Sequence, residues 1–377
     1  MTTTINNEHK KLNVPNLRFP EFQGEWEKTK FGDIAVVVGG GTPDTNTSQY
    51  WNGKIQWFTP SEIGRNKYVY NSVRTISEEG LNKSSAKLLP IGTILLSSRA
   101  TVGECSINKK ECTTNQGFQS LIPKENISNE FVYYLIQTKR KDLIRKSCGS
   151  TFLEISANEV RKIVVSIPTI KEQDKIAKLL SLLDERISTQ SKIIDKLQSL
   201  IKGIAQKIVR SNKPNVRLYE CVECSSSTQQ ESEVCEQGAY PVYGANGIVG
   251  YLDDYNTEGE AVYIIKDGSG VGTVSYVTGK CSATGTLNTL QAKDGYSLQY
   301  LYYLLKVFNF EPYKTGMAIP HIYFKDYGKA KVFCPSYTEQ LQYARLLSAI
   351  DSKLSVEKNT LRNLSLQKQY LLRQMFI

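Results

Sequence analysis

The sequence predicts a mixed α+β protein in which two homologous α/β domains follow one another, each succeeded by a long helix. The first observation behind this prediction is an internal repeat, because the Tyr-Tyr-Leu at 133–135 returns at 302–304. The second is a heptad-spaced apolar stripe behind each copy, and the third is a set of strand-like runs ahead of each stripe. A period near 170 residues far exceeds the roughly 20 to 50 residues of solenoid units, so the copies are whole domains.

The helix starts repeat as well, at an offset two residues shorter: the Pro-x-x-x-Glu-Gln at 168–173 returns at 335–340. A single length difference, between 135 and 149, reconciles the two offsets. A chain of 377 residues has room for two or three domains with real cores. The predicted organisation is a polar tail (1–13), a first domain (14–167), a central helix (168–212), a second domain (213–334) and a C-terminal helix (335–377).

Each domain shows strand-like runs around a helical stretch. In the first, apolar and β-branched residues predict strands at 91–98 and 162–167, with a helix at 131–146 between them. In the second, strands are expected at 260–265 and 272–277, and a helix at 298–307. Framework positions recur between the copies, whereas loops differ, as 98–101 differs from 267–270. Copies that keep a fold but change their loops are expected to read two different targets.

The two long helices are predicted from apolar residues spaced alternately four and three apart, a heptad stripe that requires a partner helix. Each would run about 40 residues, or roughly 60 Å. Pro168 and Pro335 precede the helices, and a break at 211–215 ends the central one. The residues expected to pair the helices are Leu180, Leu183, Ile187, Ile194, Leu197, Ile201, Leu347, Ile350, Leu354, Leu361, Leu364 and Leu371.

A lone stripe of this kind would more simply indicate a core helix of one domain. Here both stripes carry a polar interruption at the same heptad position, Gln190 in the first and Glu357 in the second, and the two are offset exactly as the helix starts are. This coincidence favours two helices that pair with each other as a spacer. Heptad spacing does not distinguish parallel from antiparallel pairing.

Composition limits the class of protein. The 47 Lys and Arg residues against 37 Asp and Glu leave a formal charge of +10, which favours a polyanionic partner without identifying it. The chain has neither an apolar run of the roughly 18 residues needed to span a bilayer nor a secretion signal at its polar N-terminus, so the cytoplasm is the expected compartment. Among eight scattered cysteines only Cys221 and Cys224 have metal or redox spacing. With two histidines in the chain, reduced thiols are expected and a zinc site is not.

Catalytic motifs are scarce. The glycine-rich run at 267–272 lies between two strand-like runs and opens no helix, so a β-turn is predicted there and not a phosphate cradle. The glycines at 39–41 are no stronger evidence, and no P-loop sequence occurs. His9 lies in a polar tail and His321 beside a proline, so neither completes a Ser-His-Asp or Cys-His arrangement. The sequence therefore predicts no catalytic residue and no metal site.

Several short motifs occur in a fixed order in the two copies. They are Gly-Gly-Thr-Pro (40–43), Tyr-Trp (50–51), Ile-Gln-Trp (55–57) and Asn-Gln-Gly-Phe (115–118), then Tyr-Gly-Ala-Asn-Gly (243–247), Gly-Tyr (250–251) and Lys-Asp-Gly (266–268), with the two Pro-x-x-x-Glu-Gln helix starts. In this order, over residues 14–376, the chain resembles the specificity subunit of a type I restriction-modification system. The resemblance implies two target recognition domains, each reading one half of a split, asymmetric site in double-stranded DNA. It also implies that the two helices pack as an antiparallel coiled coil that sets the unread gap.

The resemblance further implies partners. In this family two methyltransferase subunits dock on the helices and bring S-adenosylmethionine and adenine-N6 chemistry, while restriction subunits supply ATP- and Mg²⁺-dependent translocation and cleavage. The chain would then bind none of these cofactors, catalyse nothing by itself and need no membrane. It lacks an Asn-Pro-Pro-Phe adenine methyltransferase motif, consistent with this division of labour.

Reading DNA requires side chains that hydrogen-bond base edges, while Lys and Arg on phosphates set the register. Arg99 is the strongest candidate for guanine because its fork engages two acceptors. The candidates in the first domain are the loop residues Thr42, Lys54, Trp57, Ser61, Arg99, Thr101, Gln116, Ser150 and Thr151. Those in the second are Tyr243, Asn246, Lys266, Asp267, Ser269, Lys314 and His321, the last two bounding the loop 314–321. The bases of either half-site and the gap length do not follow from these residues, because DNA shape also contributes.

Two other functions compete with this one. A coiled-coil adaptor without DNA specificity would explain the helices and the duplication, but not the large, divergent globular copies with a basic excess. A nucleotide-binding enzyme would explain the glycine-rich loops, but it needs acidic or histidine catalytic partners that the sequence lacks.

Overall fold

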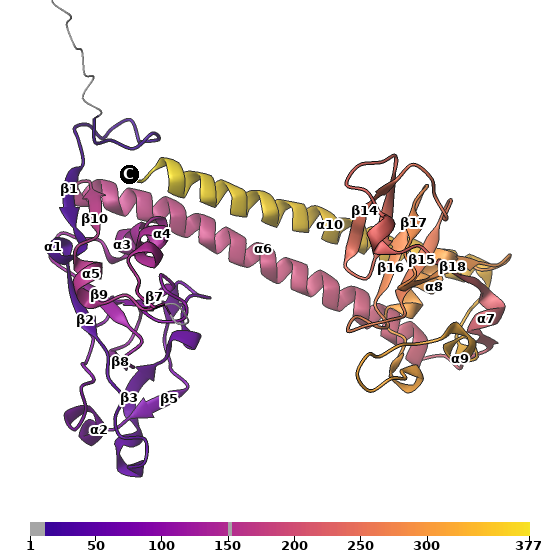
Figure 1. Ribbon diagram of the computed structural model, residues 1–377, viewed down its shortest axis with the longest axis horizontal. Helices are drawn as coiled ribbons and strands as arrows, with labels where there is room; N and C mark the ends of the chain where they lie inside the picture. Colours follow the sequence, from indigo (N-terminus) through magenta and orange to yellow (C-terminus); the bar gives the residue numbers. More distant parts are fainter. Residues whose placement is uncertain (1–11, 150–152) are drawn as a thin grey trace, which may run out of the picture. The chain divides into compact units, whose positions relative to one another are not determined.

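A computed structural model describes residues 12–149 and 153–377 (Figure 1). It forms two compact units: unit 1 comprises the described residues up to Ser188 together with Arg362–Ile377, and unit 2 comprises Thr189–Leu361. The helices α6 (Ile170–Arg210, 41 residues) and α10 (Tyr337–Gln374, 38 residues) each contribute one segment to each unit. The predicted fold class, mixed α+β with a long helix behind each domain, is confirmed. The predicted domain borders stay a prediction.

Unit 1 contains three sheets within its described residues. Their strand orders are β2-β9-β6-β7-β4, β5-β3-β8 and β1-β10. The strands are β1 (Glu27–Lys30), β2 (Ala35–Gly39), β3 (Trp51–Phe58), β4 (Tyr68–Val69), β5 (Arg74–Ile76), β6 (Ile94–Leu96), β7 (Cys105–Asn108), β8 (Cys112–Thr114), β9 (Gln119–Pro123) and β10 (Val164–Ile167). The short helices are α1 (Phe31–Ile34), η1 (Ser48–Tyr50), η2 (Pro60–Glu62), α2 (Glu78–Asn82), α3 (Asn129–Thr138), α4 (Arg140–Arg145) and α5 (Ala157–Arg161).

Unit 2 repeats this plan. Its sheets have the orders β12-β18-β15-β16, β14-β13-β17 and β11-β19. The strands are β11 (Val216–Arg217), β12 (Val222–Ser226), β13 (Tyr240–Gly244), β14 (Gly247–Leu252), β15 (Ala261–Ile265), β16 (Val274–Val277), β17 (Ser282–Ala283), β18 (Leu287–Ala292) and β19 (Lys331–Val332). The short helices are α7 (Leu218–Cys221), η3 (Glu231–Glu233), α8 (Leu298–Leu305), η4 (Glu311–Tyr313) and α9 (Phe324–Tyr327).

The strand registers show which residues occupy equivalent places in the two domains. In unit 1, Ile94 pairs with both Ile107 and Leu121; in unit 2, Val262 pairs with both Tyr276 and Leu290. The stretch from Val262 to Tyr276 is one residue longer than the stretch from Ile94 to Ile107, so the loop after β15 contains one residue more than the loop after β6. Aligning 98–101 directly with 267–270 is wrong by one residue, because a sequence repeat does not reveal an insertion inside a divergent loop.

The short elements differ from the predicted ones where local turns interrupt them. The strand predicted at 91–98 is shortened to β6, because Pro90 and Thr93 close a turn (Thr93 N to Pro90 O, 3.3 Å) in which Gly92 has a φ of 87°. The helix predicted at 131–146 becomes α3 and α4, which break at Lys139, whose N–H is shared between the carbonyls of Leu135 and Ile136. The glycine-rich run at 267–272 is a turn between β15 and β16, as predicted.

Each unit has a core that includes segments of both long helices. In unit 1, Ile176, Leu180 and Phe376 belong to the same buried cluster as α3, and Lys368 of α10 forms an ion pair with Asp184 of α6 at 2.6 Å. In unit 2, Ala205 and Ile208 of α6 line the same small cavity as Leu347 of α10. All twelve residues expected to pair the helices are buried or partly buried.

The polar interruption of the two stripes forms a contact within unit 2. The Gln190 amide donates hydrogen bonds to the Glu357 carboxylate and to its backbone oxygen, and Lys353 pairs with the same carboxylate. Gln190 thus faces Glu357 while residues 205–208 face Leu347, so the two helix segments of unit 2 run antiparallel. Ion-pairing to Lys353, followed by the Gln190 hydrogen bond, lowers the pKa of Glu357. Both members of the polar pair therefore have partners.

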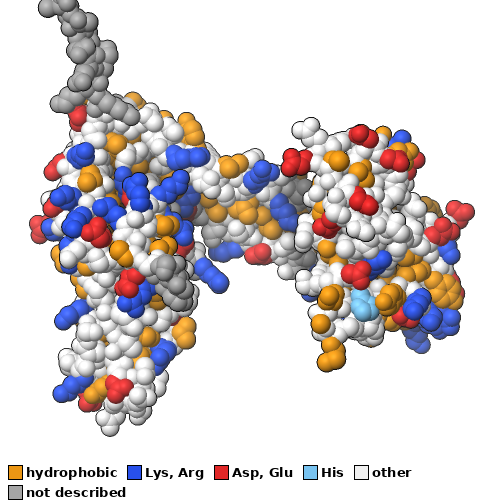
Figure 2. Space-filling model, in the orientation of Figure 1, with side chains coloured by type: hydrophobic (Ala, Val, Ile, Leu, Met, Phe, Trp, Pro, Cys, Tyr) orange, Lys and Arg blue, Asp and Glu red, His pale blue; other side chains and the backbone are white. Residues whose placement is uncertain are grey.

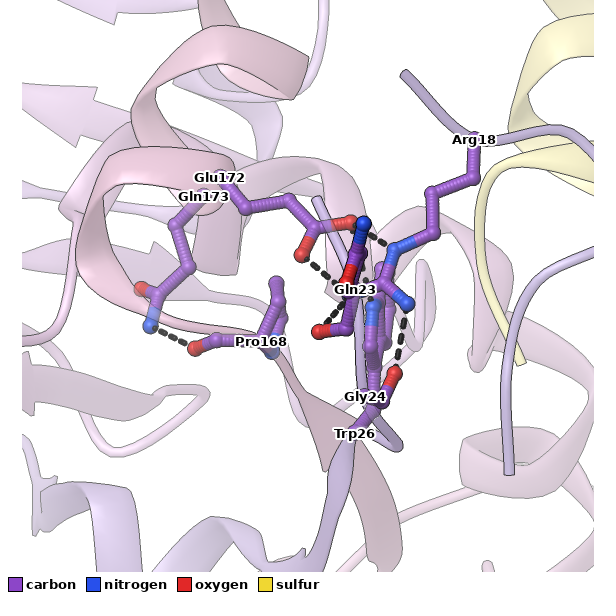
Figure 3. Close-up of polar contacts among 7 residues, drawn as sticks. All are labelled: Arg18, Gln23, Gly24, Trp26, Pro168, Glu172 and Gln173. Atoms are coloured by element: carbon purple, nitrogen blue, oxygen red, sulfur yellow. Dashed lines mark hydrogen bonds and ion pairs between the residues drawn. The ribbon is translucent and has the colours of Figure 1, made fainter. Parts of the chain in front are cut away.

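Both long helices begin with the same glutamine clamp. The Gln173 side chain accepts from Ser128 N (2.9 Å) and donates to Pro168 O (2.9 Å), and Gln340 repeats both contacts with Ser297 and Pro335. The clamp ties each long helix to the start of α3 or α8, which explains the repeated glutamine. The residue before it differs between copies: Glu172 is buried and bound by Arg18 and Trp26 (Figure 3), whereas Glu339 is exposed and caps Ser336.

A partly buried ion pair joins the start of β4 to α3 in unit 1. The Lys67 amine donates to Glu130 (2.9 Å) and Ser181 (3.1 Å), and the Tyr68 hydroxyl donates to the same carboxylate. Burial lowers the pKa of the Lys67 amine. Burial also acts to raise the pKa of Glu130, but the hydrogen bonds from Tyr68 and Lys67 outweigh it, so this pKa lies below its ordinary value.

We expect Glu130→Gln to destabilise unit 1 in a pH-dependent manner. A carboxylate whose pKa is depressed by folding contributes stability above its unfolded pKa, and this contribution is lost as the pH falls through the folded value. The difference in unfolding free energy between wild type and Glu130→Gln should therefore be present at pH 7 and shrink below about pH 4.5. Urea titrations followed by tryptophan fluorescence measure it, because Trp26, Trp51 and Trp57 all lie in unit 1. Glu125→Gln, at an exposed site of the same unit, is the control; an equal pH dependence in both variants would contradict the assignment.

Candidate nucleic-acid interface

The loops that carry the unit 1 candidates are joined by backbone hydrogen bonds. Gly41 N donates to Thr114 O (2.8 Å), Asn115 N to Phe58 O (3.0 Å) and Ser98 N to Gly117 O (2.8 Å). The loops at 40–42, 59–62, 97–101 and 115–117 therefore meet at one edge of the unit. This edge holds Thr42, Ser61, Arg99, Thr101 and Gln116.

Close contacts explain why glycine is required at this edge. A Cβ at Gly40 would lie 2.0 Å from Asn115 O, and one at Gly41 would lie 2.3 Å from Ser85 Oγ. The first of these neighbours is backbone and cannot give way, so the Gly-Gly-Thr-Pro motif allows the two loops to touch. Thr42 then donates from its hydroxyl to the Gln116 side chain. The motif brings two candidate residues into direct contact.

The side chain of Trp57 packs inside unit 1 and is hydrogen-bonded to the backbone of this edge. Its side chain is 4% exposed, and its indole N–H donates to Gly41 O at 2.9 Å. Its ring packs edge-on against Trp51 at 5.1 Å, and the Arg74 guanidinium lies 3.6 Å from the centre of the Trp51 ring. In the structure Trp57 therefore serves the framework of the edge, and its direct contact with DNA stays a prediction.

The other candidates of unit 1 are Lys54, on β3, and two residues outside the described ranges. Lys54 is exposed on β3 beside the residues Asn52 and Gly53, where the pairing with β5 is irregular. Ser150 and Thr151 lie outside the described residues.

The unit 2 candidates meet at an equivalent edge. Lys266 N donates to Thr286 O (2.9 Å), Gly268 N to Pro320 O (2.9 Å) and Thr284 N to Tyr243 O (2.9 Å). His321 and Thr315 exchange both backbone hydrogen bonds, at 2.8 and 2.9 Å, which closes the loop 314–321. The edge accordingly carries Lys266, Asp267, Ser269, Lys314 and His321.

The exposure of these side chains differs. Asn246 is exposed at the tip of the β13–β14 hairpin and Ser269 is exposed in the loop after β15. Lys266, Asp267, Lys314 and His321 are partly buried. Tyr243 packs its ring 5.7 Å from that of Tyr263, and burial raises its pKa. Its strand pairing gives it the place that Phe58 has in unit 1, so Tyr243 is mainly a framework residue.

The partner of Arg99 was missed from the sequence. Glu154 forms an ion pair with Arg99 (Nε to Oε1, 2.8 Å), and the two residues are bridged through their backbones. Glu154 could have been found from the sequence, because the offset of 167 residues between the two helix starts also relates Glu154 to the candidate His321. Met317 and Ile319, fully and 67% exposed, lie in the loop 314–321 that the sequence already offered as a candidate.

On the face drawn in Figure 2, Lys and Arg side chains are spread over unit 1 with Asp and Glu among them. Within the described part of the chain, no three His, Cys, Asp or Glu side chains gather as a potential metal site. The eight cysteines are unpaired, and Cys221 Sγ lies 3.8 Å from Cys334 Sγ. No helix in the described ranges has both the length and the apolar content needed to cross a membrane.

Comparison with known proteins adds family and fold. The family model described as "Type I restriction modification DNA specificity domain" matches residues 23–199 and 215–365. The chain is 39% identical over 180 residues to the type I restriction enzyme MjaIX specificity subunit of Methanocaldococcus jannaschii, covering 46% of this chain and 42% of that protein. It is 31% identical over 230 residues to the EcoR124I/EcoR124II specificity subunit of Escherichia coli, covering 58% and 53%. The match to the E. coli EcoprrI specificity subunit is 23% identical over 362 residues and covers 87% and 88%.

The aligned regions thus span about half the length of the first two relatives. Among solved structures, the S subunit of a type I restriction-modification system from M. genitalium has a TM-score of 0.66 at 19% identity, covering 97% of this chain and 99% of that one. A chain from a structure of the type I R-M system, on its assembly and conformational transition, has a TM-score of 0.58 at 16% identity and covers 93% and 97%. These structural matches show the same fold.

Proposed function

Because the chain belongs to the family of type I restriction-modification DNA specificity proteins, we propose that it reads a bipartite, asymmetric DNA site, one half with each domain. One observation carries the proposal: the two domains share their strand registers and helix clamps, yet present different side chains at equivalent loop edges. A conserved frame with divergent loops is what two readers of different sequences require. The net charge of +10 supports attraction to the phosphate backbone.

The long helices support a spacer role. Each has about 40 residues and would extend over roughly 60 Å as a straight helix. The polar pair Gln190–Glu357 favours one register of the two stripes, because a shifted register would bury one member without its partner. We propose that the helix pair sets the length of the unread gap between the half-sites.

Partner subunits are proposed to bind the outer faces of these helices. Several large apolar side chains on α6 and α10 point away from the pairing stripes, with exposed fractions from 48% to 57%: Leu182, Leu200, Leu346, Val356, Leu366 and Tyr370. Two methyltransferase subunits would dock there, and restriction subunits would join the complex. S-adenosylmethionine, ATP and Mg²⁺ would be bound by those partners, and this chain would be a non-catalytic subunit.

The test is selection of binding sites by the complex of this chain with its methyltransferase subunit. A library of duplexes randomised over about 25 base pairs should yield two short conserved blocks separated by a gap of fixed length. The competing adaptor function, without DNA specificity, would yield binding that is equal for all sequences and abolished by salt. Selection of no motif would refute the proposed function.

Exchange of residues 14–160 for the same region of another family member should change one block of the selected motif and leave the other block and the gap unchanged. Each domain has its own core and its own loop edge, so its contacts with bases do not depend on the other. The measurement is the same library selection with the chimeric chain. A change in both blocks would contradict independent reading.

A further inference from the structure

Equivalent backbone bridges mark one position in each recognition edge. In unit 1, Glu154 exchanges two backbone hydrogen bonds with Cys148, both 2.9 Å, and is bridged to Arg99. In unit 2, His321 makes the same exchange with Thr315 and is bridged to Asp267. The residues that follow Glu154 and His321 also make equivalent contacts. Ile155 N donates to Ser98 O at 3.0 Å, and Ile322 N donates to Lys266 O at 2.9 Å. Glu154 therefore occupies the place of His321, and Arg99 that of Asp267.

The charge at the first of these two places is inverted between the domains. The loop after β6 carries a cation, Arg99, bridged to an anion, Glu154, whereas the loop after β15 carries an anion, Asp267, bridged through its backbone to His321. In unit 1 the two side chains meet through Arg99 Nε and Glu154 Oε1 at 2.8 Å, and they are 46% and 43% exposed. The backbone hydrogen bonds are kept in both domains while the side chains change from Arg99 and Glu154 to Asp267 and His321, as expected of residues that read different bases.

The backbone of Arg99 is held in a fixed turn. Its carbonyl accepts from Thr101 N (2.6 Å) and from the Ser97 hydroxyl (3.0 Å), and the next residue, Ala100, has a φ of 58°. This left-handed conformation is unusual for a residue other than glycine, and strained positions of this kind gather at functional sites. The side chain of Arg99 thus projects from a rigid support, and the carboxylate on its Nε fixes the plane of the guanidinium.

We propose that Glu154 is a positioning residue that orients Arg99 to read a guanine in the first half-site, and that Asp267 reads a cytosine at the equivalent place in the second. This inference rests on the proposed function and names a pair of specificity determinants within it. An arginine whose Nε is engaged presents its two Nη groups as a fork, which matches the O6 and N7 acceptors of guanine in the major groove. An aspartate instead accepts a hydrogen bond from the N4 amino group of cytosine.

Two alternatives make different claims about the same residues. An ordinary surface ion pair contributes little to stability and nothing to base preference. An arginine bound to phosphate raises affinity for all sequences equally and steepens the dependence of binding on salt. Base preference at a single position separates these from the proposed role.

The experiment compares library selections by the complex carrying wild-type chain, Glu154→Gln, Arg99→Lys, and the double variant Arg99→Asp with Glu154→His, which transplants the unit 2 pair. Arg99→Lys keeps the charge but loses the fork, so preference for guanine at one position should fall about 5- to 150-fold. Glu154→Gln should relax the same position and no other. The double variant should change that position from guanine to cytosine. Asp142→Asn, which breaks the exposed Arg145–Asp142 ion pair elsewhere in unit 1, should leave the motif unchanged.

The outcomes are separable from the failure of the proposed function. If the wild-type complex selects no motif, the proposed function fails. If it selects a bipartite motif that Glu154→Gln leaves unaltered, the positioning role of Glu154 is refuted. If Arg99→Lys leaves the preference at every position unaltered, Arg99 does not read a base and the inference is overturned. Tryptophan fluorescence of each variant shows whether unit 1 is folded, since all three tryptophans report on it.

Discussion

Insertion of seven residues into both α6 and α10 is expected to abolish binding to the natural DNA site and to create specificity for a site with a longer gap. One heptad in each helix keeps the pairing stripes in phase. Placing the insertions after Ser188 and after Leu361, at the borders of the two units, leaves the contacts within each unit intact. The helices lengthen by about 10.5 Å, which corresponds to the rise of about three base pairs.

The expected size of the effect follows from the difference in affinity between specific and non-specific DNA binding. If one half-site can no longer be reached, affinity for the original site should fall toward the non-specific level, a loss of about 1,000-fold or more. Library selection with the lengthened chain should return the same two blocks with a gap longer by up to about three base pairs. Seven residues inserted after Lys213, in the exposed loop behind α6, form the control, because they lengthen neither helix. An unchanged gap in the doubly lengthened chain would rule out the spacer role.

Glu172→Ala is expected to destabilise unit 1 by about 3 kcal/mol. Glu172 is 1% exposed, and its two oxygens accept from Arg18 Nε and Nη2, both at 2.8 Å (Figure 3). The indole N–H of Trp26 donates to the same carboxylate at 3.3 Å. Removing the carboxylate leaves three N–H groups of Arg18 and Trp26 without this acceptor, and the Arg18 side chain is only 17% exposed, so little water can replace it.

The chain supplies its own control for this prediction. Glu339 holds the place of Glu172 in the repeated helix start, but it is exposed and makes only capping contacts with Ser336. Glu339→Ala should cost unit 2 only about 1 kcal/mol, the ordinary loss of a cap, and should leave the unfolding of unit 1 unchanged. Urea unfolding of unit 1, followed by tryptophan fluorescence, should show a midpoint lowered by about 1 to 2 M for Glu172→Ala. A midpoint equal to that of wild type would show that the buried pair does not stabilise the unit.

Glu172 is buried and paired because the first described segment of the chain packs over it. Leu17 N donates to Gln374 O at 2.9 Å, and Phe376 stacks on Phe131 with ring centres 5.2 Å apart. The segment at 17–26 and the end of α10 thus pack onto unit 1, and no sequence pattern at Glu172 itself signals this cover. The matching glutamate of the second helix has no such segment above it.

At the loop edges, too, the sequence predicted some features and missed others. The Gly-Gly-Thr-Pro and Asn-Gln-Gly-Phe motifs both supplied candidates, and in the folded chain Thr42 and Gln116 from these motifs contact each other. Trp57, expected at DNA from the Ile-Gln-Trp motif, is instead buried with its indole against Gly41. Glu154 was overlooked although the offset of the helix starts relates it to His321, because no local pattern shows that it pairs with Arg99, 55 residues earlier in the chain.

The features that could be predicted without a structure are those that recur with a regular spacing: two α/β domains, the heptad stripes with Gln190 and Glu357 in phase, and the Gln173 and Gln340 helix starts. Such features follow from spacing along one segment, which is visible without knowing what that segment touches. Which of two equivalent residues is buried, and which loop residues become partners, emerged from the folded chain alone. Burial and pairing depend on segments that lie far apart along the chain, as Arg18 covers Glu172 and Glu154 meets Arg99, and no local pattern records them.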